Sequence, residues 1–105
     1  MLERAEEMQE VLDLRPSRYF ADDQIGRLAR KALRSDVYEF CDAGNELGKA
    51  FRSANPRVDL DPVREMRYNL AHEYPNVTPE ALLAFAQEIV PRVIRGLRRA
   101  HFPKD

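Results

Sequence analysis

Residues 67–74, Arg67-Tyr68-Asn69-Leu70-Ala71-His72-Glu73-Tyr74, bring an arginine, an amide, a histidine and a phenol together just before Pro75. The proline predicts that a helix ends here. On a helix each residue advances about 100°, so Arg67 and His72 are about 140° apart and do not point at one substrate atom. A site that uses both needs either a helix end that unwinds near Tyr74 or a second copy of the helix across a two-fold axis.

The sequence on either side of this stretch predicts further helices and no strand. Apolar residues recur every three or four positions, and capping residues and prolines mark the boundaries. The expected helices cover residues 1–14, 22–53, 62–73 and 79–99, with a stop at Arg15-Pro16-Ser17 and a connecting loop at 18–21. Pro91 lies inside the last helix and should kink it. The expected fold is an all-α, four-helix up-and-down bundle with a kinked last helix.

The long second helix shows the clearest apolar face. The residues expected to be buried there are Ile25, Leu28, Ala29, Ala32, Val37, Phe40, Cys41, Gly44, Leu47, Gly48 and Phe51. Gly44 and Gly48 suggest close approach of another helix, with a small kink as the alternative. Tyr19 and Phe20 are expected to anchor the preceding loop over the core. Arg27, Arg30, Lys31 and Arg34 share one face, as do Arg92, Arg95 and Arg99, and each face is either solvated or a track for phosphate.

The composition limits the possible functions. The 105 residues are expected to form a single domain, residues 1–105, with 33% charged residues and a net charge of −1. No apolar run reaches the ~18 residues of a membrane span. Cys41 is alone and falls on the apolar face, so we expect a buried thiol and a cytoplasmic protein without disulfides. Fourteen of the seventeen basic residues are arginines, which suit phosphate binding.

The spacing Arg67, four residues, His72, one residue, Tyr74 resembles the R-x4-H-x-Y signature of the HEPN superfamily, specifically its HepT-like ribonuclease toxins. The resemblance covers about residues 22–97. It includes the order of Gly44-Asn45-Glu46, Pro56 and Pro91 along the chain. The family has a small polar residue directly after the arginine, where this chain has Tyr68 followed by Asn69.

This resemblance implies a HEPN-type bundle and a metal-independent endoribonuclease, the toxin of a type VII-like toxin–antitoxin pair. It implies that Arg67 and His72 are catalytic across a homodimer, with Asn69 and Glu73 as supporting polar residues. The expected substrate is RNA, with tRNA as the first candidate, and no cofactor is expected. The expected partner is a minimal nucleotidyltransferase antitoxin, with a hetero-oligomer of the two proteins as one form of the assembly. That enzyme would transfer AMP to Tyr74 and silence the toxin.

The residue types fit this chemistry. A histidine can exchange protons near neutral pH, and an arginine offers several donors to a phosphate. RNA cleavage needs no metal when the ribose 2′-hydroxyl is the nucleophile. One cysteine and two distant histidines, His72 and His101, do not form a zinc site, and His101 in the tail is expected to play no part.

Two other functions remain open on the sequence alone. The chain could be a non-catalytic HEPN protein that binds nucleotide or substrate for a nucleotidyltransferase, and Tyr68 keeps that alternative open. It could also be a helical dimerisation domain, because one arginine and one histidine on a helix can be purely structural.

Overall fold

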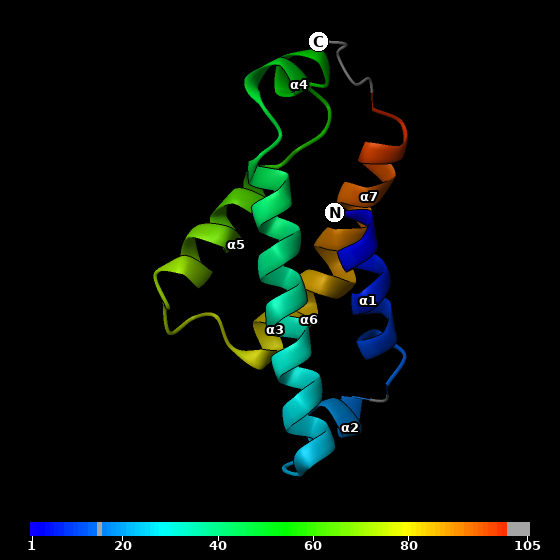
Figure 1. Cartoon of the computed structure of the whole chain (residues 1–105), viewed down its shortest axis with the longest axis vertical. Helices are drawn as coiled ribbons and strands as arrows, with labels where there is room; N and C mark the ends of the chain where they lie inside the picture. The colour runs from blue at the N-terminus through cyan, green and yellow to red at the C-terminus, as the bar shows by residue number, and fades with distance from the viewer. Residues whose placement is uncertain (15, 101–105) are drawn as a thin grey trace.

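The side chain of Asp23 accepts a hydrogen bond from the Gly26 N–H at 2.8 Å and so begins α3, Gln24–Asn45, the longest helix. The computed structural model describes residues 1–14 and 16–100 (Figure 1). The other helices are α1 (Leu2–Leu12), α2 (Pro16–Tyr19), α4 (Lys49–Ala54), α5 (Asp61–Ala71), α6 (Pro79–Ala84), the π-helical turn η1 (Phe85–Ile89) and α7 (Val90–Arg98). No strand occurs within the described residues, and the expected all-α fold is confirmed. Arg15 and His101 lie outside them.

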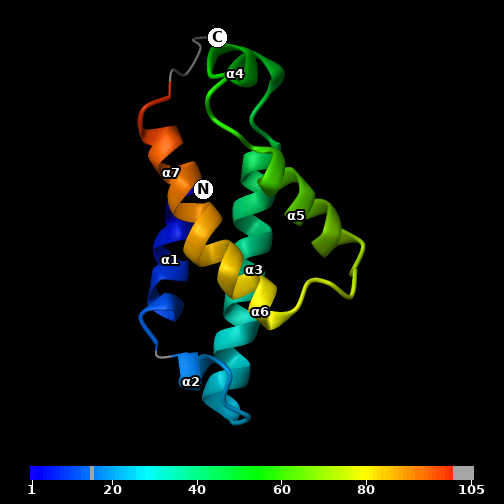
Figure 2. The ribbon, with the colours of Figure 1, turned by 180° about the vertical axis from the view of Figure 1, so that it is seen from behind.

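Helix α3 is the centre of the packing. Helices α1 and α5 both contact α3, and α1 also contacts η1 and α7. Figure 2 shows α1 and α7 lying side by side, whereas α5 slopes away from them and ends at the edge of the molecule. The C-terminal end of α5 and the loop that follows it therefore stand apart from the main core.

The loop expected at residues 18–21 is partly helical, because Pro16–Tyr19 forms α2. The Arg30 guanidinium donates from one nitrogen to the carbonyls of Tyr19 and Ala21, at 2.8 and 2.9 Å, and so satisfies the end of that turn. Tyr19 is 1% exposed and donates its hydroxyl to the Pro79 carbonyl at 2.9 Å. Tyr19 thus anchors α2 to α6 as expected, whereas Phe20 is 40% exposed.

The helix expected to reach Ser53 ends at Asn45, and this expectation is wrong. Gly48 is the extended residue before α4 and has open space beside it, so it does not mark a close helix contact. Gly44 does: a Cβ there would lie 2.8 Å from a methyl of Val63 on α5. The break turns the chain so that Phe51 on α4 is buried at 5% exposure.

The buried face of α3 is rotated by one residue from the expected one over its first half. Ile25 and Leu28 are 49% and 56% exposed, and Ala32 is also exposed. Leu33 is fully buried instead. The first half of α3 extends beyond α1 and α5 (Figure 1), so only the side facing α2 and α6 is covered there. Ala29 and the expected residues from Val37 to Gly44 are buried, including the fully buried Phe40 and Cys41, whereas Leu47 is half-buried and Gly48 is exposed. Burial raises the pKa of the Cys41 thiol to about 12, which makes it unreactive.

The last helical segment, in which a kink is expected at Pro91, contains a π-helical turn directly before that proline. The Val90 N–H bonds to the Phe85 carbonyl, five residues back. In a regular α-helix Pro91 lacks an N–H to donate and its ring clashes with the preceding turn. The wider π-turn leaves room for the ring. Helix α7 then ends at Arg98, one residue before the expected end.

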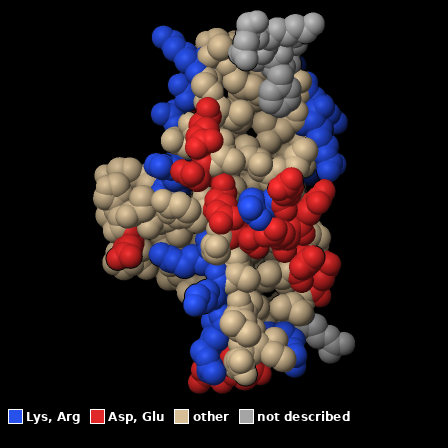
Figure 3. Space-filling model, viewed as in Figure 1, with Lys and Arg blue, Asp and Glu red and all other residues tan. Residues whose placement is uncertain are grey.

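Charged side chains line the contact between α1 and α3, where Figure 3 shows acidic groups gathered. Arg4 bonds to Glu7 and to Glu39, each at 2.7 Å. Asp36 is only 9% exposed, and its burial and its hydrogen bond with Glu7 raise its pKa from 3.8 to about 6. The hydrogen bond with Asp36 lowers the pKa of Glu7. We call these four residues the acidic seam. Below pH about 6, Asp36 and Glu7 share a proton.

Candidate functional site

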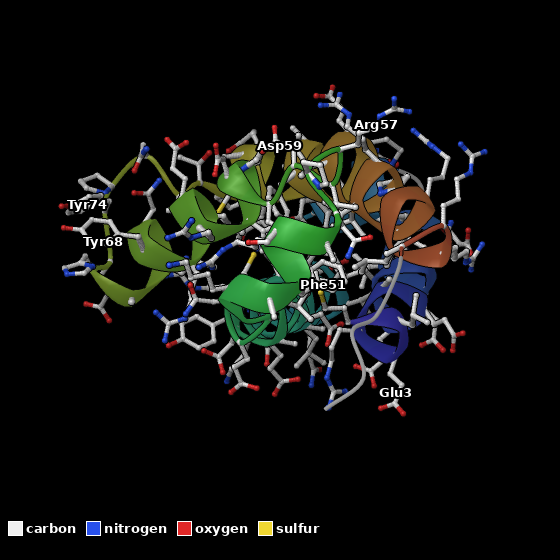
Figure 4. All side chains as sticks on the ribbon, turned by 90° about the horizontal axis from the view of Figure 1, so that it is seen from above. Glu3, Phe51, Arg57, Asp59, Tyr68 and Tyr74 are labelled. Carbon is white, nitrogen blue, oxygen red and sulfur yellow. The ribbon has the colours of Figure 1, made fainter. Side chains whose placement is uncertain are left out.

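The residues of the R-x4-H-x-Y motif lie on the second half of α5 and in the turn after it. Val63 and Leu70, at 0% and 5% exposure, hold α5 against α3. Beyond Leu70 the chain leaves the core, and Figure 4 shows Tyr68 and Tyr74 at the outer edge of the molecule. The motif therefore sits on an exposed helix end supported from one side only.

Arg67 is directed toward α3. Its Nε donates to the Asp42 carboxylate at 2.9 Å, and its side chain is 36% exposed. This hydrogen bond with Asp42 raises the pKa of Arg67, so the guanidinium remains charged. Because the pair is partly exposed, water and a competing phosphate can reach it.

His72 is the C-cap of α5 and is exposed. Its Nδ1 lies 2.8 Å from the Tyr68 carbonyl oxygen. A carbonyl oxygen only accepts hydrogen bonds, so Nδ1 carries the proton and the neutral ring has its lone pair on Nε2. The ring also stacks on Tyr68, with centroids 4.0 Å apart and an interplanar angle of 29°. Tyr68 thus fixes both the tautomer and the orientation of His72.

Tyr74 completes an aromatic cluster with Tyr68 and His72. Its ring centroid lies 5.8 Å from each of those rings, and Tyr74 is 42% exposed. Glu73 adopts a positive φ of 52°, and the Tyr74 N–H donates to the Asn69 carbonyl at 3.0 Å. This left-handed step folds Tyr74 back over the helix end. A hydrogen bond with Tyr68 raises the pKa of Tyr74, which keeps it a neutral phenol.

The expected helix 62–73 therefore ends two residues early, at Ala71, and the end of α5 unwinds before Tyr74 as one of the two sequence alternatives anticipated. The turn brings His72 and Tyr74 together. It does not bring Arg67 to them, because the Arg67 guanidinium is held by Asp42 on α3. Of the supporting residues, Asn69 contributes its backbone carbonyl, and Glu73 is an exposed residue of the turn.

Sequence reasoning missed Asp42 and the role of Tyr68. Asp42 precedes Arg67 by 25 residues, and no local pattern links them. Tyr68 precedes His72 by four residues, which places the two rings as neighbours on a helix, so that spacing could have indicated the stack.

Two findings bear on metals and membranes. Within residues 1–14 and 16–100, no group of three histidine, cysteine or carboxylate side chains could hold a metal ion. Over the same residues, each helix is too short or too polar to cross a bilayer.

Comparison of the chain with protein-family models, with curated proteins and with solved structures gave no match in any of the three.

Proposed function

We propose that the chain is a HEPN-type ribonuclease toxin that cleaves RNA without a metal, using His72 and Arg67. The observation that carries the proposal is the state of His72. Its Nδ1–H is held by the Tyr68 carbonyl, which leaves the lone pair of the neutral ring on Nε2 of an exposed residue at the end of α5.

In the proposed reaction, Nε2 of His72 accepts the proton of a ribose 2′-hydroxyl. The 2′-oxygen attacks the adjacent phosphorus, and the bond from phosphorus to the 5′-oxygen breaks. The leaving 5′-oxygen takes a proton from the imidazolium that His72 has become. The products are a 2′,3′-cyclic phosphate and a 5′-hydroxyl. A guanidinium stabilises the additional charge on the phosphoryl oxygens, and this is the role of Arg67.

The site needs a second chain. Arg67 and His72 diverge on α5, and Arg67 is engaged by Asp42 within its own chain. A homodimer with two α5 ends facing each other would supply the partner's Arg67 to His72, and a phosphate between them would compete with Asp42. Sedimentation should give twice the chain mass at micromolar concentration. A monomer under these conditions would count against this arrangement.

Tyr74 suits the proposed off-switch. Its ring is exposed and lies 5.8 Å from the His72 ring. Transfer of AMP from ATP forms a phosphodiester at the Tyr74 oxygen and releases pyrophosphate. The added phosphate and base would then occupy the space beside His72 and repel an RNA phosphate. The donor enzyme in this proposal is a minimal nucleotidyltransferase antitoxin, which acts in the cytoplasm.

Tyr74→Phe tests the switch. The ring and its packing remain, but the acceptor oxygen is lost, so the variant should stay toxic in cells that contain the transferase. Tyr38→Phe is the matched control, because Tyr38 is also exposed, at 38%, and lies on α3. Mass spectrometry should find AMP on Tyr74 of the co-expressed wild type. Full neutralisation with unmodified Tyr74 would show that complex formation alone inhibits the protein.

One observation favours the second candidate function, a non-catalytic subunit that binds nucleotide or substrate for a nucleotidyltransferase. Asp42 neutralises Arg67, and Tyr68 covers one face of the His72 ring. In this alternative the aromatic cluster stacks on a base and performs no proton transfer.

RNA cleavage by the purified protein in the presence of a chelator separates the two functions. The ribonuclease predicts cleavage that survives chelation and that falls by about 10²–10⁴-fold in His72→Ala. Arg64→Ala, an exposed arginine of the same helix, is the matched control and should cleave normally. Cleavage that His72→Ala leaves unchanged, or that requires added magnesium, would contradict the proposal.

A further inference from the structure

A second basic region lies away from the motif, between α7 and the segment that joins α4 to α5. The region is a hollow of about 530 Å³. Figure 4 shows Arg57 over the α7 side of the molecule and Tyr68 and Tyr74 at the opposite edge. The lining residues include Arg57, Arg92, Arg95 and Arg99, and we call this region the arginine groove.

The four arginines form one cationic surface. Arg92, Arg95 and Arg99 are spaced i, i+3 and i+7, which places them on one face along about 10 Å of helix axis. Arg57 faces them from the other wall. Among residues 1–14 and 16–100, no carboxylate lines the groove and none forms an ion pair with these four side chains.

Other described arginines, such as Arg18, Arg64 and Arg98, also form no ion pair, so what sets these four apart is that they line one hollow together. Arg4, Arg27 and Arg67 each lie within 3.6 Å of an acidic oxygen. The chain has eighteen acidic residues against seventeen basic ones, so carboxylates are not scarce. Like charges gathered on one face of a helix repel one another and destabilise it. An anionic ligand would remove that repulsion.

The floor of the groove is small and apolar. Ala54, Val58, Gly96 and Ala100 contribute to it. Gly96 lies on the same face as the arginines, and a Cβ there would already contact Val58 at 3.5 Å. The missing side chain lets α7 lie close to Val58 on the other wall of the groove.

We infer that the arginine groove binds the phosphodiester backbone of single-stranded RNA. Several guanidinium groups in a row match successive phosphates, whereas a single small anion would need only one or two of them. Guanidinium planes also stack on unpaired bases, which a single strand exposes and a duplex does not. An acidic protein segment has the right charge but gains nothing from planar stacking.

This inference rests on the proposed ribonuclease function for its substrate class, and it adds an anchoring site distinct from the cleavage site. Because the groove and the aromatic cluster are on opposite sides, a short oligonucleotide cannot occupy both on one chain. The groove should therefore lower the KM for a long RNA and have no effect on the cleavage of a dinucleotide.

The test is fluorescence anisotropy with a labelled 20-nucleotide single strand whose 2′-O-methyl riboses cannot be cleaved. Arg92→Gln with Arg95→Gln should raise the Kd at least tenfold at low salt. It should also reduce the slope of log Kd against log salt by about 1.4, since each phosphate contact contributes about 0.7 for single strands. Arg18→Gln with Arg98→Gln is the matched control. It removes the same charge, and neither residue lines the groove, so its Kd should change less than twofold.

The outcomes separate the inference from the proposed function. Equal loss of binding in the groove variant and the control would overturn the inference, because the effect would then be one of net charge. Displacement of the RNA by polyglutamate at equal charge concentration would also overturn it and indicate a protein partner. Groove-dependent binding without any cleavage by wild type would support the groove and reject the ribonuclease. Circular dichroism confirms that both double variants remain helical.

Discussion

The C-terminal end of α5 and the interior of α3 use their residues in opposite ways. At the end of α5, the contacts are local: His72 rests on Tyr68 four residues earlier, and Tyr74 bonds to Asn69 five residues earlier. Around α3 the contacts join distant parts of the chain, such as Tyr19 to Pro79 across 60 residues. The core can therefore tolerate little change, whereas the helix end can change its chemistry at small cost in stability.

The largest expected effect is on the free energy of unfolding, when an aromatic ring is truncated in each of the two regions. Phe40 is fully buried, so Phe40→Ala should lower the free energy of unfolding by about 3–5 kcal/mol. Tyr68 is 52% exposed, so Tyr68→Ala should change it by less than about 0.5 kcal/mol while removing the support of His72. Urea denaturation of both variants measures the difference. Comparable destabilisation by the two changes would show that the helix end is part of the core.

The same contrast separates the features that could be predicted from the sequence from those that could not. Local patterns were sufficient to place a helix end before Pro75, although two residues too late, and to place Cys41 in the core. They failed where tertiary packing decides. The apolar spacing of Ile25 and Leu28 resembles a buried stripe, but no helix covers that side of α3.

The break after Asn45 could not be read from the sequence for a similar reason. Gly44 and Gly48 look equivalent on a helix, yet only Gly44 faces another helix. The same limit applies to the candidate site. Spacing places His72 and Tyr74 in one turn, but the partner of Arg67 depends on how α5 packs on α3.

An intermediate effect concerns the acidic seam and depends on pH. Burial raises the pKa of Asp36 to about 6, from 3.8 in the unfolded chain. Between these values the folded state holds a proton that the unfolded state has lost, so the Asp36 contribution makes stability fall as pH rises from about 4 to 6. Asp36→Asn removes this fall. Its stability should match wild type near pH 4 and exceed it by about 1–3 kcal/mol at pH 7.

Thermal denaturation at a series of pH values measures this difference. Glu10→Gln is the comparison variant, since Glu10 lies on α1, is exposed and is not part of the seam. It should leave the fall between pH 4 and 6 in place. Parallel pH profiles for wild type and Asp36→Asn would mean that Asp36 ionises without penalty in the folded protein.

The smallest expected effect joins the two regions, because Asp42 on α3 holds Arg67 on α5. The pair is partly exposed, so breaking it should cost at most about 1 kcal/mol of stability. Asp42→Asn keeps the shape of the side chain and frees the Arg67 guanidinium to bind an RNA phosphate. If Asp42 only competes with the substrate, the variant should cleave RNA up to about fivefold faster, which is the same energy expressed as a rate. Glu88→Gln, an exposed carboxylate of η1 without an ion pair among the described residues, is the control. Slower cleavage by Asp42→Asn would instead mean that Asp42 positions Arg67 for catalysis. An unchanged rate, together with an inactive Arg67→Ala, would show that the phosphate already displaces Asp42 in the wild type.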